Sequence, residues 1–207
     1  MKSIYVDTSN KKFMFDLGMM FAKGEKIKIL NVEDVNKKIK EELKLGFAKS
    51  FNMMIKYWQD NNLAPNFNLT SEEKKVFLIC PVRNATQEEK EKLNALVKDY
   101  ENKGYKIHYP ERDANQNPVV NGVNTGGYSI CFDNTVANAN AKNTVLFYNK
   151  KSAGSMFDLG VTYYFKTLNP ERKFFLANEI KLDENDYIDN KVAELLFKNK
   201  AELSITK

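Results

Sequence analysis

The stretch T-V-L-F-Y-N-K-K-S-A-G-S-M-F-D-L-G, from Thr144 to Gly160, decides the fold because it joins a strand, a turn and the start of a helix. Thr144 to Tyr148 is a short apolar, β-branched and aromatic run, which predicts a buried strand. The small and polar residues that follow predict a loop. Ser155 is a candidate helix N-cap, since its hydroxyl can accept from free amides of the first turn. The helix is then expected to begin near Met156.

Asp158 falls in the first turn of this predicted helix, beside the positive end of the helix dipole. A carboxylate in that position is expected to stay ionised at neutral pH. A strand, a small-residue loop and a helix N-terminus at the carboxyl edge of a parallel sheet together suit an anionic or hydroxyl-rich ligand. Spacing alone leaves two interpretations open: Asp158 either meets a ligand or only caps and charges its helix.

The beginning of the chain repeats this unit. Strand, helix and strand are predicted at Ser3 to Asp7, Phe13 to Lys23 and Lys26 to Asn31. I-Y-V-D-T-S-N-K-K-F-M-F-D-L-G aligns without a gap with L-F-Y-N-K-K-S-A-G-S-M-F-D-L-G at a constant offset of 142, and Met14 to Gly18 is identical to Met156 to Gly160. After the helix, the second copy carries five further residues before K-F-F-L-A-N, which parallels K-I-K-I-L-N.

The two copies differ in the loop. A lysine and a phenylalanine stand in the first copy where the second has Gly154 and Ser155. These larger side chains cannot reproduce a small loop that lets backbone amides approach a ligand. The first copy is therefore interpreted as retained scaffold, and Asp16 as a helix-start charge.

Strands and helices alternate along the rest of the chain, which predicts an α/β fold with a mostly parallel sheet and helices on both faces. A long amphipathic helix is expected from Asp34 to about Asp60, followed by a linker from Asn61 to Ser71. This divides the chain into residues 1–70, a βαβα half-repeat with the long helix, and residues 71–207. The further predicted elements are the central strand Val76 to Cys80, a helix from a Thr86/Glu89 capping box to Gly104, the strand Tyr105 to Tyr109, the long loop Pro110 to Gly127, the helix Tyr128 to Ala141 and a closing helix from Asp186 to about Glu202.

Composition excludes several functional classes. The 207 residues are 43% hydrophobic, contain no stretch of membrane-spanning length and show no signal peptide, so we expect a soluble cytoplasmic protein without a membrane partner. A net charge of +5 is mild and spread out, which argues against a nucleic-acid partner. Cys80 and Cys131 match no ligand or redox spacing and are expected to be reduced thiols. The single histidine, His108, is interpreted as a packed or edge residue, and no metal or other cofactor is expected.

Four motifs occur in order in V-F-L-I-C-P-V-R-N, Y-P-E-R-D-A-N-Q, I-C-F-D-N-T-V-A and S-A-G-S-M-F-D-L-G. Together they resemble the nucleoside 2-deoxyribosyltransferase-like family over roughly Val76 to Asn178. The resemblance implies a flavodoxin-like (Rossmann-like) α/β fold and chemistry at the N-glycosidic bond of nucleosides or nucleotides. In that family an acidic residue attacks the anomeric carbon of the sugar, and Asp158 occupies its position here.

The resemblance also implies a set of substrate-binding residues. Ser152, Gly154 and Ser155 would line the sugar or phosphate pocket, and Arg83 would pair with a 5'-phosphate or remain an ordinary surface arginine. Asn134 would hydrogen-bond across the pocket mouth, and Tyr109 or Tyr128 would stack on a base unless they pack in the core. Asp113 or Asn115 would touch the base or sugar, unless Arg112 and Asp113 form an ion pair that orders the loop. The remaining expected substrate contacts are Cys80, Pro81, Asn84 and, if it is not held in that ion pair, Arg112.

The chain departs from the family pattern at the nucleophile. Asp158 is one methylene shorter than the family's glutamate, and an error of about 1 Å in placing reacting groups can cost around 100-fold in rate. Lys142 and Asn149 also stand where relatives often carry acidic residues. The resemblance as a whole still leads us to expect hydrolysis or (deoxy)ribosyl transfer on a nucleoside or nucleoside 5'-monophosphate, with Asp158 as the nucleophile. The alternative is a non-catalytic nucleotide-binding or sensing module. A homo-oligomer, a dimer or higher, in which a neighbouring chain completes the pocket, is also expected.

Overall fold

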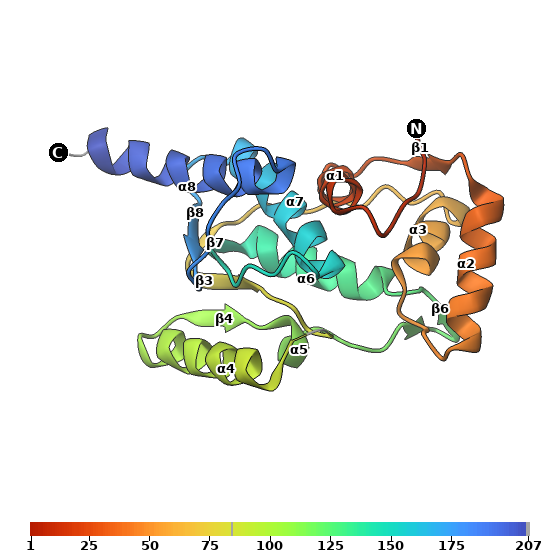
Figure 1. The fold of residues 1–207 in the computed structure, drawn as a ribbon, viewed down its shortest axis with the longest axis horizontal. Coiled ribbons are helices and arrows are strands. Elements are labelled where there is room, and N and C mark those ends of the chain that lie inside the picture. Colours follow the sequence, from red (N-terminus) through yellow and green to blue (C-terminus); the bar gives the residue numbers. More distant parts are fainter. Residues whose placement is uncertain (84, 206–207) are drawn as a thin grey trace.

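Figure 1 shows an α/β protein in which one parallel sheet lies between helices. This computed structural model describes residues 1–83 and 85–205, with side chains through Phe197. The predicted contact Asn84 lies outside the described residues. The elements in chain order are β1 Lys2–Ile4, α1 Lys11–Ala22, β2 Ile27–Ile29, α2 Val32–Lys44, α3 Phe51–Asp60, β3 Glu72–Ile79, α4 Gln87–Asn102, β4 Lys106–His108, α5 Pro110–Asp113, β5 Val119–Val120, β6 Val123–Asn124, α6 Tyr128–Asn140, β7 Ala141–Leu146, α7 Ala153–Leu168, β8 Lys173–Leu176 and α8 Tyr187–Ile205.

The main sheet has the strand order β4-β3-β7-β8, with every pair parallel. Side chains alternate across strand β3, so Phe77 and Ile79 pack with helices α6 and α7 on one face. Val76 and Leu78 pack on the other face with residues of α4. The prediction of a parallel sheet with helices on both faces is confirmed. Because all strands run the same way, their carboxyl ends meet at one edge of the sheet.

The predicted repeat is visible in the backbone. Strands β1 and β2 form a separate parallel pair around α1, as β7 and β8 do around α7. The register Ile4 to Ile29 in the first copy corresponds to Leu146 to Leu176 in the second. The Asn31 side chain accepts from the backbone N–H of Val6 at 2.8 Å and donates to its carbonyl at 3.0 Å.

Asn178 brackets Tyr148 in the same way, at 2.7 and 3.1 Å. The aligned residues therefore make the same hydrogen bonds in both copies, which confirms the N-terminal half-repeat.

The two repeated helices cross each other at reciprocal positions. A methyl group on Gly18 would lie 2.0 Å from the carbonyl oxygen of Phe157, and one on Gly160 would lie 2.0 Å from that of Phe15. Phe157 is the repeat equivalent of Phe15, as Gly160 is of Gly18. An exchange of equivalent residues across a contact is the mark of a two-fold axis, here within one chain. Helices α1 and α7 can approach so closely only because both contact positions are glycine.

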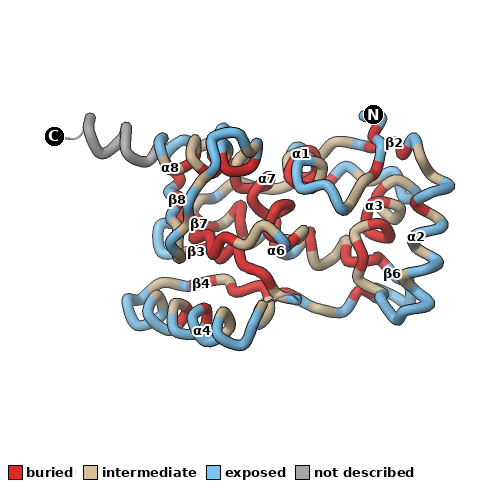
Figure 2. The backbone as a smooth tube through the Cα atoms, in the orientation of Figure 1, coloured by how far each residue is buried: buried red, intermediate tan, exposed pale blue. Residues whose placement is uncertain are grey.

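Aromatic rings continue this pseudo-two-fold contact. The Phe21 ring lies 5.5 Å from Phe157, and Tyr163, the equivalent of Phe21, lies 5.5 Å from Phe15. One apolar cluster consequently contains residues from both 1–70 and 71–207, including Trp58 and Phe165. Figure 2 shows buried segments in β3 and β7 and also in α7, α1 and α3.

The prediction of one long helix from Asp34 to about Asp60 is wrong, because two helices, α2 and α3, occupy that segment. Gly46 adopts φ +78 after α2, a left-handed conformation that ends the helix. The hydroxyl of Ser50 then caps α3 by accepting from the Met53 amide at 3.2 Å.

The loop predicted from Pro110 to Gly127 contains helix α5 and the β5-β6 hairpin. The capping box of Thr86 and Glu89 is confirmed at the start of α4.

Alanine substitution at the crossing should destabilise the fold. Gly18→Ala or Gly160→Ala places a methyl group against backbone that has no room to retreat, and overpacking of this kind costs about 1–3 kcal/mol. Chemical denaturation should therefore show a lower free energy of unfolding for both variants. Gly154→Ala is the matched control in α7, since its added methyl would meet only the Ser152 hydroxyl at 3.9 Å. Equal stability of all three variants would contradict the close crossing.

Candidate functional site

A cavity of about 470 Å³ lies where the carboxyl end of the sheet faces helices α2 and α3. One wall comes from residues 71–207 and contains Cys80, Arg83, Asn134, Ser152, Gly154 and Asp158. The opposite wall comes from the N-terminal segment and contains Glu42, Phe47, Lys49, Ser50, Phe51 and Met54. Residues that follow the first repeat, from the end of α2 to α3, thus cover the site that the second repeat carries.

The start of α7 differs from the sequence prediction by three residues. Ser152, and not Ser155, is the N-cap, and its hydroxyl accepts from the Ser155 amide at 3.2 Å. Ser155 is fully buried, and its hydroxyl has no hydrogen-bond partner among the described residues. It does not line the cavity, whereas Ser152 and Gly154 do. The helix begins early because Ala153 and Gly154 fit its first turn without a clash.

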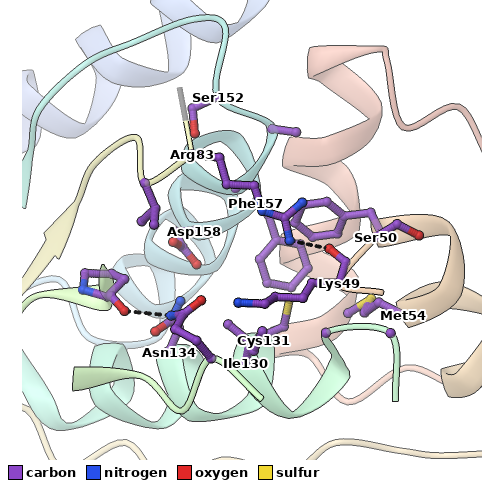
Figure 3. A pocket seen from close by; sticks show the side chains of 18 of the residues that line it. Lys49, Ser50, Met54, Arg83, Ile130, Cys131, Asn134, Ser152, Phe157 and Asp158 are labelled. Atoms are coloured by element: carbon purple, nitrogen blue, oxygen red, sulfur yellow. Dashed lines mark hydrogen bonds between the residues drawn. The ribbon is translucent and has the colours of Figure 1, made fainter. Parts of the chain in front are cut away.

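Asp158 consequently lies in the second turn of α7 and points into the cavity (Figure 3). Only 8% of its surface is exposed, and its carboxylate forms no hydrogen bond or ion pair with any described residue. Burial raises the pKa of Asp158 to about 7. The pKa is therefore higher than expected for a carboxylate beside the helix dipole, because Asp158 lies beyond the first turn, where the dipole mainly acts, and desolvation favours the neutral form.

The equivalent aspartate of the first repeat has a different environment. Asp16 accepts an ion-paired hydrogen bond from Lys12 at 2.8 Å and lies 3.4 Å from the Tyr187 hydroxyl. Lys12 is one helical turn before Asp16, where the side chains of a helix meet. In the second repeat Gly154 stands at the position of Lys12. The glycine removes the cation that would pair with Asp158, so the carboxylate stays free.

Three cationic side chains line the cavity, namely Lys49, Arg83 and Lys151. The Arg83 guanidinium donates to the backbone carbonyl of Lys49 at 2.6 Å, which ties the two walls together. The Lys49 ammonium extends across the cavity towards Asp158 in Figure 3. Neither Lys49 nor Lys151 forms an ion pair within the described part of the chain. Arg83 thus both links the two walls of the cavity and places a positive charge at the site.

The remaining wall is mostly apolar and aromatic. The residues concerned are Phe47, Phe51, Met54, Ile130 and Phe157. Phe51 and Phe157 pack with ring centroids 5.6 Å apart. Burial raises the pKa of the Cys80 and Cys131 thiols, and the nearby charge of Asp158 adds to the effect, so both are neutral thiols. A ligand with an aromatic part would bury its flat apolar face against these rings, so this wall favours such a ligand.

Of the predicted contacts, Cys80, Arg83, Asn134, Ser152 and Gly154 meet Asp158 at the cavity. Pro81, Tyr109, Arg112, Asp113, Asn115 and Ser155 do not line it.

The loop residues are occupied with one another. The Tyr109 hydroxyl donates to Glu111 at 2.5 Å, and Arg112 pairs with Asp113 at 2.6 Å. Asn115 accepts from the Asn117 amide, and Tyr128 packs against Phe21 in the core.

Sequence reasoning missed the whole N-terminal wall, including Lys49 and Phe51. These residues reach the cavity only through the α1–α7 crossing, which no local pattern reveals.

We compared the chain with known proteins and found no relative. Neither family models, curated proteins nor solved structures gave a match to this chain. Within the described residues, no group of three or more His, Cys, Asp or Glu side chains is arranged to hold a metal ion. No helix in that part of the chain is long and apolar enough to cross a membrane.

The free carboxyl of Asp158 should make stability depend on pH. Between pH 4 and 7 the unfolded chain loses a proton that the folded chain keeps, so stability falls as pH rises through this window and then levels off. Asp158→Asn removes this effect. Its stabilising gain should be larger at pH 8 than at pH 5, by up to about 2–3 kcal/mol.

Thermal and denaturant unfolding at both pH values would measure the difference. Asp16→Asn is the matched control, because it alters the equivalent residue of the first repeat. A gain that is the same at both pH values for Asp158→Asn would show that the carboxyl is not buried as described.

Proposed function

We propose that this protein cleaves or transfers at the N-glycosidic bond of a nucleoside or nucleoside 5'-monophosphate. The supporting observation is the Asp158 carboxylate, which has no partner among the described residues and projects into a cavity of nucleotide size. Its environment is enclosed and partly apolar, so a charge that develops on the sugar meets little competition from water. The family resemblance of the four sequence motifs points to the same chemistry.

In the proposed reaction, one carboxylate oxygen of Asp158 attacks the anomeric carbon of the sugar. The bond between that carbon and the base nitrogen breaks, and its electron pair leaves with the base, which takes up a proton. Water or a second base then attacks the same carbon and releases the sugar from Asp158. Only the ionised carboxylate can attack, and a pKa of about 7 leaves about half of it ionised at pH 7.

The charges of the cavity support a phosphorylated substrate. Lys49, Arg83 and Lys151 outnumber the two carboxylates, Glu42 and Asp158, that line the same space. A 5'-phosphate would balance this excess, and guanidinium and ammonium groups are suited to bind it. The aromatic wall around Phe51 and Phe157 would cover the base.

The segment that follows the first repeat takes the role that we expected of a neighbouring chain. Lys49, Ser50 and Phe51 complete the cavity from within the same polypeptide. A second copy is thus not needed to close the site, and the expected homo-oligomer stays a prediction that a measurement of mass in solution would decide.

Turnover should depend on Asp158 and not on its equivalent. Purified protein is incubated with ribo- and deoxyribonucleosides and their 5'-monophosphates, and free base is measured by chromatography. Wild type and Asp16→Asn should release base at similar rates, whereas Asp158→Asn should be slower by about 100-fold or more, because it lacks the attacking oxygen.

Gly154→Lys provides a second test with the carboxylate retained. A lysine there copies Lys12 of the first repeat and should pair with Asp158 one turn later. It should therefore also abolish turnover. No release of base by wild type, or unchanged release by Asp158→Asn, would exclude the proposed reaction.

The second candidate is a module that binds a nucleotide without converting it. The shorter side chain of aspartate and the raised pKa of Asp158 favour it, since a partly protonated carboxyl can hydrogen-bond ribose hydroxyls. Calorimetry followed by recovery of the ligand separates the two candidates. A sensor would return the nucleotide intact, and an enzyme would return free base.

A further inference from the structure

Asn134 lies on the buried face of α6, with 8% of its surface exposed, and forms part of the cavity wall beside Asp158 (Figure 3). Its side-chain oxygen is 3.0 Å from Nε2 of His108. An amide oxygen can only accept a hydrogen bond, so Nε2 of His108 carries the proton in this contact. The only histidine of the chain therefore acts as a donor to a residue of the candidate site.

His108 is held rigidly for this contact. It ends strand β4 and pairs in register with Phe77 of β3. The two rings are stacked, with centroids 5.5 Å apart and an angle of 13° between their planes. A second cavity of about 370 Å³ borders the imidazole, and its charged residues are Lys75, Lys106, Asp113 and Asp133. His108 itself does not line the cavity that contains Asp158.

The contact with His108 fixes the direction of the side-chain oxygen of Asn134 and thereby also the direction of its NH₂ group. With its oxygen turned to His108, the NH₂ group faces the opposite way, and it makes no hydrogen bond with any residue that the structure describes. Asn134 and Asp158 both line this cavity (Figure 3).

We propose that His108 is a positioning residue, which holds Asn134 so that its NH₂ group donates a hydrogen bond to an uncharged oxygen of the ligand next to Asp158. A sugar hydroxyl or a base carbonyl supplies such an oxygen. The identity of this ligand rests on the proposed function, whereas the contact between His108 and Asn134 does not. A protonated imidazole keeps its Nε2–H, so the arrangement holds in both charge states of His108.

The contact predicts one tautomer of the neutral imidazole, which nitrogen NMR can identify without assignment because the chain has one histidine. Wild type should show the Nε2–H tautomer. Asn134→Leu removes the acceptor and should shift the population towards Nδ1–H. Nδ1–H in wild type, or no change in Asn134→Leu, would overturn the proposal whether or not the protein is a glycosidase.

Two substitutions separate positioning from packing. His108→Phe keeps a ring on Phe77 and loses the donor, and His108→Gln loses the ring but keeps an N–H donor. With the nucleoside or nucleotide that wild type converts, His108→Phe should raise KM or lower kcat/KM by about 2- to 10-fold, the effect of one hydrogen bond. His108→Gln should restore most of this loss. Equal losses in both variants would indicate a structural role only.

If wild type converts no substrate, the same variants are compared by calorimetry with nucleoside 5'-monophosphates. Weaker binding by His108→Phe than by His108→Gln would support the proposal for a binding module, and equal binding would overturn it. Failure of the proposed reaction and failure of the positioning role thus give different results.

Discussion

The structure depends on the close crossing of helices α1 and α7. Gly18 and Gly160 let each helix touch the backbone of the other, and the contact repeats itself about an internal two-fold axis. Side chains at these positions would push the helices apart and with them the two halves of the chain. The crossing is also the meeting point of the two repeats, and the Arg83–Lys49 hydrogen bond and the Phe51–Phe157 contact then hold the N-terminal wall against the site.

The two repeats have the same backbone and different chemistry. In the first, Lys12 neutralises Asp16, and Tyr187 of α8 packs on Phe15 with ring centroids 5.9 Å apart. In the second, glycine replaces the lysine, and Phe51 of α3 packs on Phe157 at the edge of an open cavity. Asp16 is thereby part of a structural ion pair, whereas Asp158 is a buried carboxyl to which no other residue in the described ranges is bonded. Such an uncompensated group costs stability, and proteins retain costs of this kind chiefly at functional sites.

Much of the fold could be predicted from the sequence, because its signals are local. The apolar run at β3, the capping box at Thr86 and the repeated M-F-D-L-G segment all appear as expected. The helix break at Gly46 was missed because the apolar spacing continues on both sides of the turn. The protonation of Asp158 was also missed, since burial is a property of the assembled walls. The N-cap moved from Ser155 to Ser152 because both hydroxyls suit the position and packing selects between them.

Only one wall of the candidate site could be predicted, because local sequence signals exist for the sheet edge and not for the N-terminal wall. Residues that follow strands β3 and β7 could be placed at the sheet edge from the order of motifs, and Arg83, Ser152 and Asp158 do meet there. Residues of the N-terminal wall, such as Lys49, lie outside both repeats and belong to no motif. The loop after β4 has suitable residue types but satisfies its own polar groups, as the pairing of Arg112 with Asp113 illustrates.

The most direct test of this account is the ionisation of Asp158 itself. Carbon NMR of the side-chain carboxyl groups, with Asp158→Asn to identify the signal, gives its pKa in the folded protein. We expect a value near 7 that changes when a nucleoside 5'-monophosphate is added. A value near the ordinary 4 that no nucleotide alters would mean that Asp158 is neither buried nor at a ligand site.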